Sequence, residues 1–210
     1  MPATVDSLYE QLFPLTTVMK QRVVETFSGD ALDTDRWSTH NGSGTGTFAM
    51  ADEVDGGFSM KTSGDSASRY NQIRFNGIRQ YNAESSGFIV IYKAGVSTNQ
   101  SISIGLWEDS YFESILSSNN TYYKLGSRNN LIGTTSVDTS IPVDTSWHVH
   151  KGETDGTSVT LEIDGTLEAT ATYPIPSNAA GDLEPFCQIA NAGGSGVKEA
   201  RLRYFEAYNT

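Results

Sequence analysis

The residues of this sequence that could carry out acid–base chemistry include Glu108, Asp109 and Glu113, in the run WEDSYFE at 107–113. Hydrolysis of a glycosidic bond with retention needs two carboxyl groups about 5 Å apart, and therefore on one face of a strand. Glu108 and Asp109 are adjacent, and adjacent strand residues point to opposite faces. A second acidic pair, Glu162 and Asp164, lacks a third partner. The spacing therefore fails, and we expect no catalytic residues and no hydrolase activity.

A second candidate for chemistry is the pair His148 and His150, which share one face of a strand because they are two residues apart. Catalytic zinc needs a third protein ligand and an open position. No cysteine or acid is placed to supply that ligand, and His40 is distant in the sequence. We therefore expect exposed strand histidines and no metal site.

No cofactor is predicted. The acidic loops at 30–35 and 52–55 do not match the ligand pattern of an EF-hand. We interpret their carboxylates as solvent-exposed, and a structural calcium ion is the alternative. The single cysteine, Cys187, lies in an apolar run and is expected to be a buried thiol.

Sugar binding is a third chemistry that the residue types permit, because aromatic faces flanked by amide side chains suit sugar rings. The candidate carbohydrate-binding residues are close in sequence: Trp107, Tyr111, Tyr122, Tyr123 and Asn120. The alternative is that the aromatic residues among them belong to the core.

The elements that must position these residues are strands. From Trp147 onward, apolar and polar residues alternate through 147–150, 158–163 and 166–171, and Asp164-Gly165 joins the last two runs. Asp-Gly between alternating runs predicts a tight hairpin, so the stretch is expected to form three consecutive antiparallel strands. From this alternation we predict that Trp147 and Val149 face inward and that Trp147 is a core anchor.

Two further strands are expected to be organising elements. Residues 87–92 are apolar on both faces, which predicts a central strand. Residues 198–208 form the last strand and are expected to return beside the first.

The composition limits the partners. The chain has 210 residues, with 25 acidic against 14 basic side chains and a net charge of −11. This argues against nucleic acid and against an anionic membrane surface as partners, and no run approaches 18 apolar residues. The many glycines and short segments favour an all-β domain.

The N-terminal residues differ from the rest, so we divide the chain into an arm, 1–24, and a domain, 25–210. A helical stripe ends before Pro14 and consists of Val5, Leu8, Tyr9, Leu12 and Phe13. A helix of about ten residues is marginal alone in water. The stripe must therefore be covered, either by the outer surface of its own domain or by another chain. The expectation preferred is an assembly arm that contacts other copies of the chain or other virion proteins.

The Trp-His pair entering a strand, followed by Asp-Gly and a strand ending in Ile-Asp-Gly, resembles the concanavalin A-like lectin/glucanase superfamily, laminin-G-type modules included. The resemblance implies an all-β, two-sheet antiparallel jelly-roll sandwich. Such domains usually act outside cells, and no export signal is seen. The function expected is therefore a non-enzymatic virion surface component (capsid decoration, accessory or fibre protein), made in the host cytoplasm, with weak adhesion to cell-surface glycans. The alternatives are a free-standing extracellular carbohydrate-binding module or lectin and, third, a glucanase relative.

Overall fold

The computed structural model describes residues 22–42, 46–50, 57–63, 70–76, 81–96, 98–108, 111–116, 121–129, 131–176, 183–192 and 196–210. The predicted arm lies outside these residues except for 22–24, and so do all five residues of its stripe, so the assembly arm stays a prediction. A search of the described part of the chain for a helix with the length and apolar character to cross a membrane finds none.

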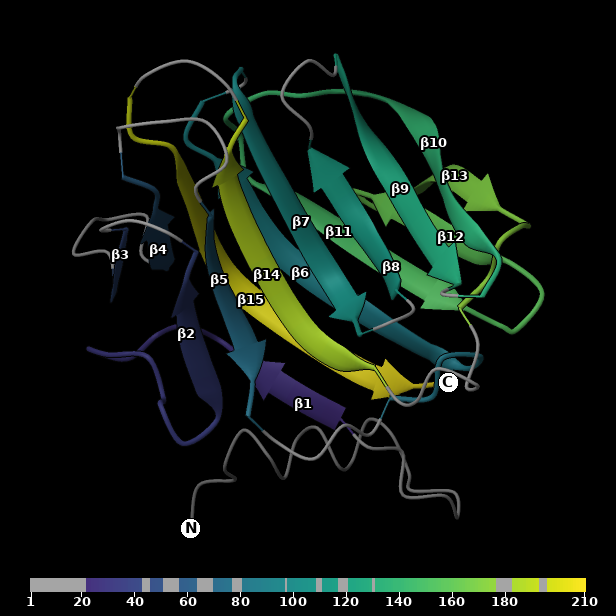
Figure 1. The fold of residues 1–210 in the computed structure, drawn as a ribbon, viewed down its shortest axis with the longest axis horizontal. Helices are drawn as coiled ribbons and strands as arrows, with labels where there is room; N and C mark the ends of the chain where they lie inside the picture. The colour runs from purple at the N-terminus through teal and green to yellow at the C-terminus, as the bar shows by residue number, and fades with distance from the viewer. Residues whose placement is uncertain are drawn as a thin grey trace, which may run out of the picture.

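Within these residues the chain forms two sheets (Figure 1). The eight-stranded sheet has the order β13-β12-β11-β6-β15-β4-β3, with β1 also paired to β15. Its strands are β1 (Arg22–Glu25), β3 (Thr47–Met50), β4 (Phe58–Lys61), β6 (Ser86–Ala94), β11 (His148–Thr154), β12 (Val159–Ile163), β13 (Thr166–Ala171) and β15 (Glu199–Asn209).

The seven-stranded sheet has the order β10-β9-β8-β7-β14-β5-β2. Its strands are β2 (Trp37–Asn41), β5 (Tyr70–Phe75), β7 (Gln100–Trp107), β8 (Tyr111–Leu116), β9 (Tyr122–Asn129), β10 (Gly133–Pro142) and β14 (Glu184–Asn191).

The two sheets lie face to face, and every pairing between named strands is antiparallel (Figure 1). The predicted all-β concanavalin A-like jelly-roll sandwich is thus confirmed. β6 lies between β11 and β15, as its two apolar faces predicted, and the closing strand β15 pairs with β1. The sheet already begins at Arg22, so 22–24 are strand residues of the domain.

The three consecutive strands predicted after Trp147 are β11, β12 and β13, which pair in that order. Asp164 and Gly165 have φ values of 51° and 82°. Positive φ at both central residues is what a type I′ hairpin turn requires, and Asp-Gly supplies it at low cost. This part of the prediction is confirmed together with its turn chemistry.

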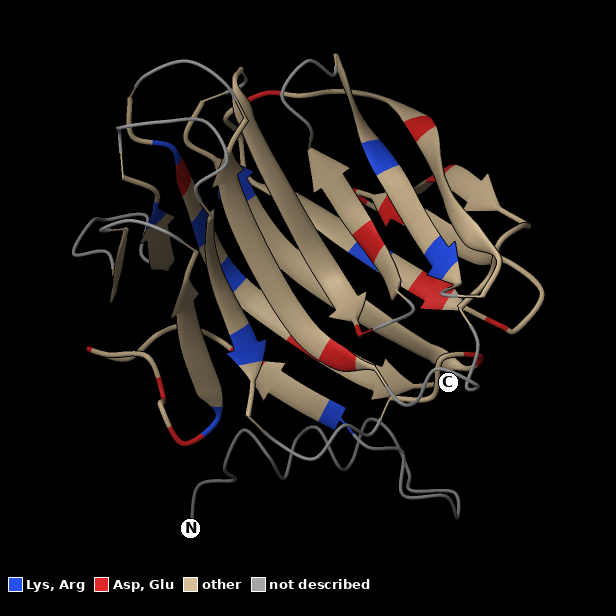
Figure 2. Ribbon diagram, in the orientation of Figure 1, with Lys and Arg blue, Asp and Glu red and all other residues tan. Residues whose placement is uncertain are grey.

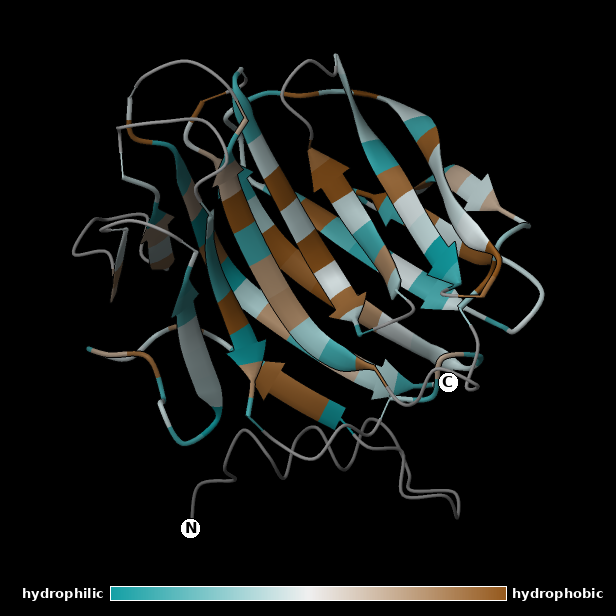
Figure 3. Ribbon diagram, in the orientation of Figure 1, coloured by the Kyte–Doolittle hydropathy of each residue, from teal (hydrophilic) through white to brown (hydrophobic). Residues whose placement is uncertain are grey.

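The core lies between the sheets, because each strand gives alternate residues to it (Figure 3). Its largest fully buried side chains include Trp37, Tyr92, Phe88, Phe112 and Phe205. Trp37 contacts Phe205 edge-on, with ring centroids 5.9 Å apart, which joins the two sheets. Cys187 is buried, as predicted, and burial raises the pKa of its thiol well above the ordinary value.

The predicted orientation of β11 is wrong. Trp147 is absent from the buried core and lies half-buried, with the Arg203 guanidinium 4.3 Å and the Lys93 ammonium 5.1 Å from its ring. Val149 is 39% exposed, whereas His150 is completely buried. A tryptophan that stacks with cations is stable outside the core, so hydrophobicity alone did not decide which face of β11 turns inward.

The two histidines predicted to be exposed are instead held by specific partners. Nδ1 of His150 is 2.8 Å from Oγ of Ser114 on the opposite sheet, and its ring lies 4.7 Å from Tyr92 and 4.8 Å from Tyr123. Burial lowers the pKa of His150 to about 3, so its ring is neutral near pH 7. His148 instead contacts two carboxylates at the sheet margin.

His148 hydrogen-bonds Asp164 at 2.7 Å and Asp144 at 3.0 Å. Partial burial alone would lower the pKa of His148, but these two carboxylates outweigh it and raise the pKa. The contact with Asp164 joins the start of β11 to the β12–β13 turn, and the contact with Asp144 joins it to the segment before β11.

We predict that Trp37→Ala and Trp147→Ala differ in stability because only Trp37 is enclosed by the core. Truncating a buried aromatic side chain costs about 3–5 kcal/mol, and we expect Trp37→Ala to lose that much free energy of unfolding. Trp147→Ala should lose about 1 kcal/mol, the scale of an exposed cation–π contact. Urea denaturation of both variants measures this. Equal losses would contradict the observed orientation of β11.

Candidate functional site

The outer face of the seven-stranded sheet carries the candidate site. On β8, Phe112, Ser114 and Leu116 are fully buried toward the core. Because strand residues alternate, Tyr111, Glu113 and Ile115 point to the outer face. This outer row of β8 lies near the middle of the sheet, between β7 and β9 (Figure 1).

Glu113 is flanked by glycine on both sides. Its register partners are Gly105 on β7 and Gly126 on β9. A Cβ atom at Gly105 would lie 2.4 Å from the carbonyl oxygen of Phe112, and one at Gly126 would lie 2.4 Å from Cδ1 of Ile115 and 3.1 Å from Cγ of Glu113. Glycine inside a strand marks such close approaches. These two glycines therefore make room for the Glu113 and Ile115 side chains.

The carboxyl group of Glu113 is shielded from water although it belongs to the outer face. Glu113 is only 7% exposed, and burial raises the pKa of its carboxyl to about 8, against an opposing hydrogen bond with Ser103. Burial disfavours the charged form of a carboxyl group. Glu113 is therefore mainly protonated at neutral pH and can donate a proton to a bound molecule.

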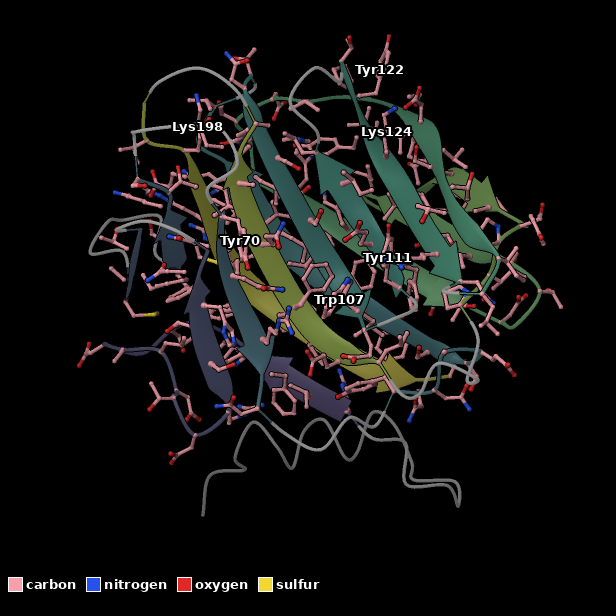
Figure 4. The ribbon with its side chains drawn as sticks, in the orientation of Figure 1. Tyr70, Trp107, Tyr111, Tyr122, Lys124 and Lys198 are labelled. Carbon is pink, nitrogen blue, oxygen red and sulfur yellow. The ribbon has the colours of Figure 1, made fainter. Side chains whose placement is uncertain are left out.

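Beside Glu113 runs a row of aromatic and basic side chains, which we call the cation–aromatic row: Arg74, Trp107, Tyr111 and Arg128. Trp107 and Tyr111 are register partners at the ends of β7 and β8, where Figure 4 shows them next to each other. The Arg74 guanidinium lies 4.4 Å from the Trp107 ring, and that of Arg128 lies 5.9 Å from the Tyr111 ring. The row thus offers half-buried rings with hydrogen-bond donors at both ends.

A second carboxyl group, Glu184 of β14, lies beside Trp107 in register. Its Oε1 is 3.7 Å from Nη1 of Arg74. Glu113 and Glu184 are two strands apart across the sheet and two residues apart along it. Because strands lie about 4.8 Å apart and rise about 3.4 Å per residue, the two Cα atoms are about 12 Å apart. Each carboxyl group has its own partner, Ser103 for Glu113 and Arg74 for Glu184.

The structure brings together only part of the predicted carbohydrate-binding set. Trp107 and Tyr111 are neighbours, while Tyr122, 41% exposed, begins β9 near the opposite end of the sheet (Figure 4). Tyr123 is completely buried between the sheets because it alternates with Tyr122, so it does not belong to the outer face. Asn120 lies outside the described residues. Sugar binding by the residues on this face stays a prediction.

The sequence analysis passed over Glu113 because it tested Glu108, Asp109 and Glu113 as if they followed a single strand. Glu108 directly follows β7, Glu113 lies on β8, and Asp109 is not among the described residues. Arg74 and Glu184 were also missed, since they come from strands far apart in the sequence. The available signal was glycine inside two strand patterns, at Gly105 and Gly126.

Two other features of the described chain provide no comparable chemistry. Groups of three or more histidine, cysteine or acidic side chains that could hold a metal ion are absent from the described residues. A hollow of about 760 Å³ opens at the sheet edges and is lined by Gly29, Asp30, Ala31, Leu32, Thr34, Thr39, Phe48, Ala49, Met50 and Phe58. Asp30 is the only titratable group among these lining residues, so the hollow lacks an acid–base pair.

Comparison with known proteins gives a likeness in structure alone. No family model matches the sequence, and no curated protein matches it. The β-glucanase of Bacillus licheniformis superimposes with a TM-score of 0.70 at 14% identity, covering 90% of this chain and 98% of that one. A lichenase from a mouse hindgut metagenome has a TM-score of 0.68 at 13% identity, covering 90% and 98% of the two chains. The laminarinase catalytic domain of Thermotoga maritima has 0.67 at 12%, covering 91% and 98%.

These neighbours are glycoside hydrolases and share the concanavalin A-like jelly roll. This chain covers nearly their whole length. The prediction of a non-enzymatic virion surface protein is contradicted by them, and so is the prediction that the chain is not an enzyme. Their printed names are those of glucan-cleaving enzymes, the class that the sequence analysis had ranked last. The spacing test considered Glu108, Asp109 and Glu113 together and did not consider carboxyl groups on neighbouring strands.

We predict that Glu113→Gln stabilises the protein at alkaline pH. Unfolded Glu113 releases its proton near its ordinary pKa of 4.5, whereas the folded protein holds it to about pH 8. Between these values the unfolded chain binds fewer protons, so the wild-type free energy of unfolding falls as pH rises, by up to ~1.4 kcal/mol per pH unit. Melting curves at pH 4 and pH 9 measure this. A variant no more stable relative to wild type at pH 9 than at pH 4 would contradict the raised pKa.

Proposed function

We propose that this protein is a glycoside hydrolase that cleaves β-linked polysaccharide on the outer face of the seven-stranded sheet. The observation that carries the proposal is Glu113, a carboxyl group only 7% exposed between Gly105 and Gly126, where burial raises its pKa to about 8, near half-buried aromatic rings. A general acid works best when its pKa lies near the working pH. The structural neighbours, which are β-glucanases and a laminarinase, support β-glucan as the first substrate to test.

In the proposed reaction Glu113 donates its proton to the glycosidic oxygen as the bond from that oxygen to the anomeric carbon breaks. Water attacks the anomeric carbon from the opposite side and loses a proton to Glu184. Trp107 and Tyr111 would hold a sugar ring by contact with its apolar face. The hydrogen-bond donors of Arg74 and Arg128 would bind substrate oxygens at either end of the row.

We propose that hydrolysis inverts the configuration of the anomeric carbon, for a structural reason. Retention needs two carboxyl groups about 5 Å apart. On β8, Tyr111 and Ile115 share the face of Glu113 and neither is acidic, so the described residues of this strand do not supply such a pair. Glu184 lies two strands away. With a substrate bound, the proposal requires the two carboxyl groups to lie about 6.5–9.5 Å apart, the separation that suits inverting hydrolysis through water.

The test is to incubate the protein with lichenan and laminarin and to measure newly formed reducing ends. We expect turnover by the wild type, and a loss of about 100-fold or more in Glu113→Gln, the scale of general acid catalysis. Activity should fall above about pH 8, where Glu113 loses its proton.

The matched control is Glu162→Gln, which removes a carboxylate from β12 in the other sheet and should retain full activity. Binding of both glucans without any release of reducing ends would contradict the proposal. So would equal activity of Glu113→Gln and wild type.

A further inference from the structure

We propose that the polysaccharide recognised by the candidate site carries acidic substituents, carboxylate or sulfate, and that Arg128 binds them. This inference rests on the proposed function and specifies its substrate class. Its basis is the position of a guanidinium group on the outer face, its lack of an acidic partner among the described residues and the charges around it.

Arg128 is placed on the same face as Glu113 by the alternation of β9. Its register partners are Tyr111 on β8 and Thr134 on β10, and neither is acidic. Its guanidinium lies 5.9 Å from the centre of the Tyr111 ring. Within the part of the chain that the structure describes, no carboxylate forms an ion pair with Arg128. The aromatic contact orients the guanidinium group on this face.

The other two cations of this face among the described strands already have acidic partners. Nη1 of Arg74 lies 3.7 Å from Glu184, and Nζ of Lys124 lies 2.7 Å from Oδ1 of Asp138. Arg128 is therefore the cation of this face whose charge is left uncompensated among the described residues. This distinguishes it from Lys124, which lies on the same strand.

The local charge of this face differs from that of the whole protein. On its described strands it carries three cations, Arg74, Lys124 and Arg128, against the carboxylates of Glu184 and Asp138, with Glu113 protonated at neutral pH. Figure 2 shows basic residues on β5 and β9, with acidic residues on β8 and β14 between them. The whole chain has a net charge of −11. An acidic polymer would be repelled from most of the surface, so its binding requires a specific site.

Guanidinium chemistry fits the proposed ligand. Arginine binds carboxylate and similar oxyanions through two parallel hydrogen bonds, which a lysine cannot reproduce. Arg128 is two residues along β9 from Gly126, the partner of Glu113, so it lies about 7 Å along the strand from the row of the proton donor. A substituent at Arg128 would then belong to a sugar next to the bond that Glu113 protonates.

The test uses Glu113→Gln as the parent, because it leaves Arg128 unchanged and removes turnover during a binding measurement. Calorimetry or affinity electrophoresis measures binding to poly-β-mannuronate, which carries carboxylates on β-linked sugars, to κ-carrageenan, which carries sulfates, and to neutral laminarin. We expect tighter binding to at least one acidic polymer than to laminarin, weakened by added salt. The polymer that binds better identifies the substituent.

Adding Arg128→Gln to this parent should weaken acidic-polymer binding at least tenfold, the loss of one charge-assisted contact, and Arg128→Lys should restore only part of it. The matched control is Arg203→Gln, which removes an arginine stacked on an aromatic ring in the other sheet and should leave binding unchanged. Unchanged melting temperatures show that the variants remain folded.

Equal binding of laminarin and both acidic polymers would overturn the inference, as would equal losses from Arg128→Gln and Arg203→Gln. Neither result bears on hydrolysis, which is measured separately with lichenan and laminarin. Turnover of neutral glucan with no acidic preference would leave the proposed function standing and remove this inference. Acidic-polymer binding through Arg128 without hydrolysis of any of these polymers would remove the proposed function alone.

Discussion

The structure depends on the face-to-face burial of two antiparallel sheets. Every strand in them must give one side to the shared core and the other to the surface, because strand side chains alternate. On β8 the core takes Phe112, Ser114 and Leu116, all fully buried. That requirement, rather than anything local to the site, turns Glu113 outward. The chemistry of the outer face is therefore a consequence of how the core is filled.

The unusual property of Glu113 follows from its neighbours on the outer face. Gly105 and Gly126 leave the space beside it free of Cβ atoms, and Ile115 occupies part of the space over Gly126. The carboxyl is thereby removed from water without entering the core, and its pKa rises to about 8. A protonated carboxyl at the surface of a sheet costs stability at alkaline pH. A functional site is a place where such a cost is tolerated.

The sequence was sufficient for the parts of the fold set by local rules. Alternation and the Asp164-Gly165 turn predicted β11 to β13, because the φ values of that turn favour these residue types. The orientation of β11 was not predictable in the same way. Its inward-facing residue His150 hydrogen-bonds Ser114 on the other sheet, while the Arg203 guanidinium packs over the ring of Trp147.

The candidate site failed to emerge from the sequence for a similar reason. Trp107 and Tyr111 were recognised because they are close in sequence as well as in space. Arg74 and Glu184, which come from strands separated by more than half the chain, meet them only through the pairings of β5, β14 and β7. Register between distant strands is set by packing of the whole sandwich.

The most direct test of this account is a titration of the Glu113 side-chain carboxyl by carbon-13 NMR, with its resonance assigned by its loss in Glu113→Gln. The account predicts a midpoint at about pH 8, so that the group is protonated at neutral pH. A midpoint near the ordinary value of 4.5 would show that Glu113 is ionised at neutral pH. That result would contradict its role as the proton donor of the site.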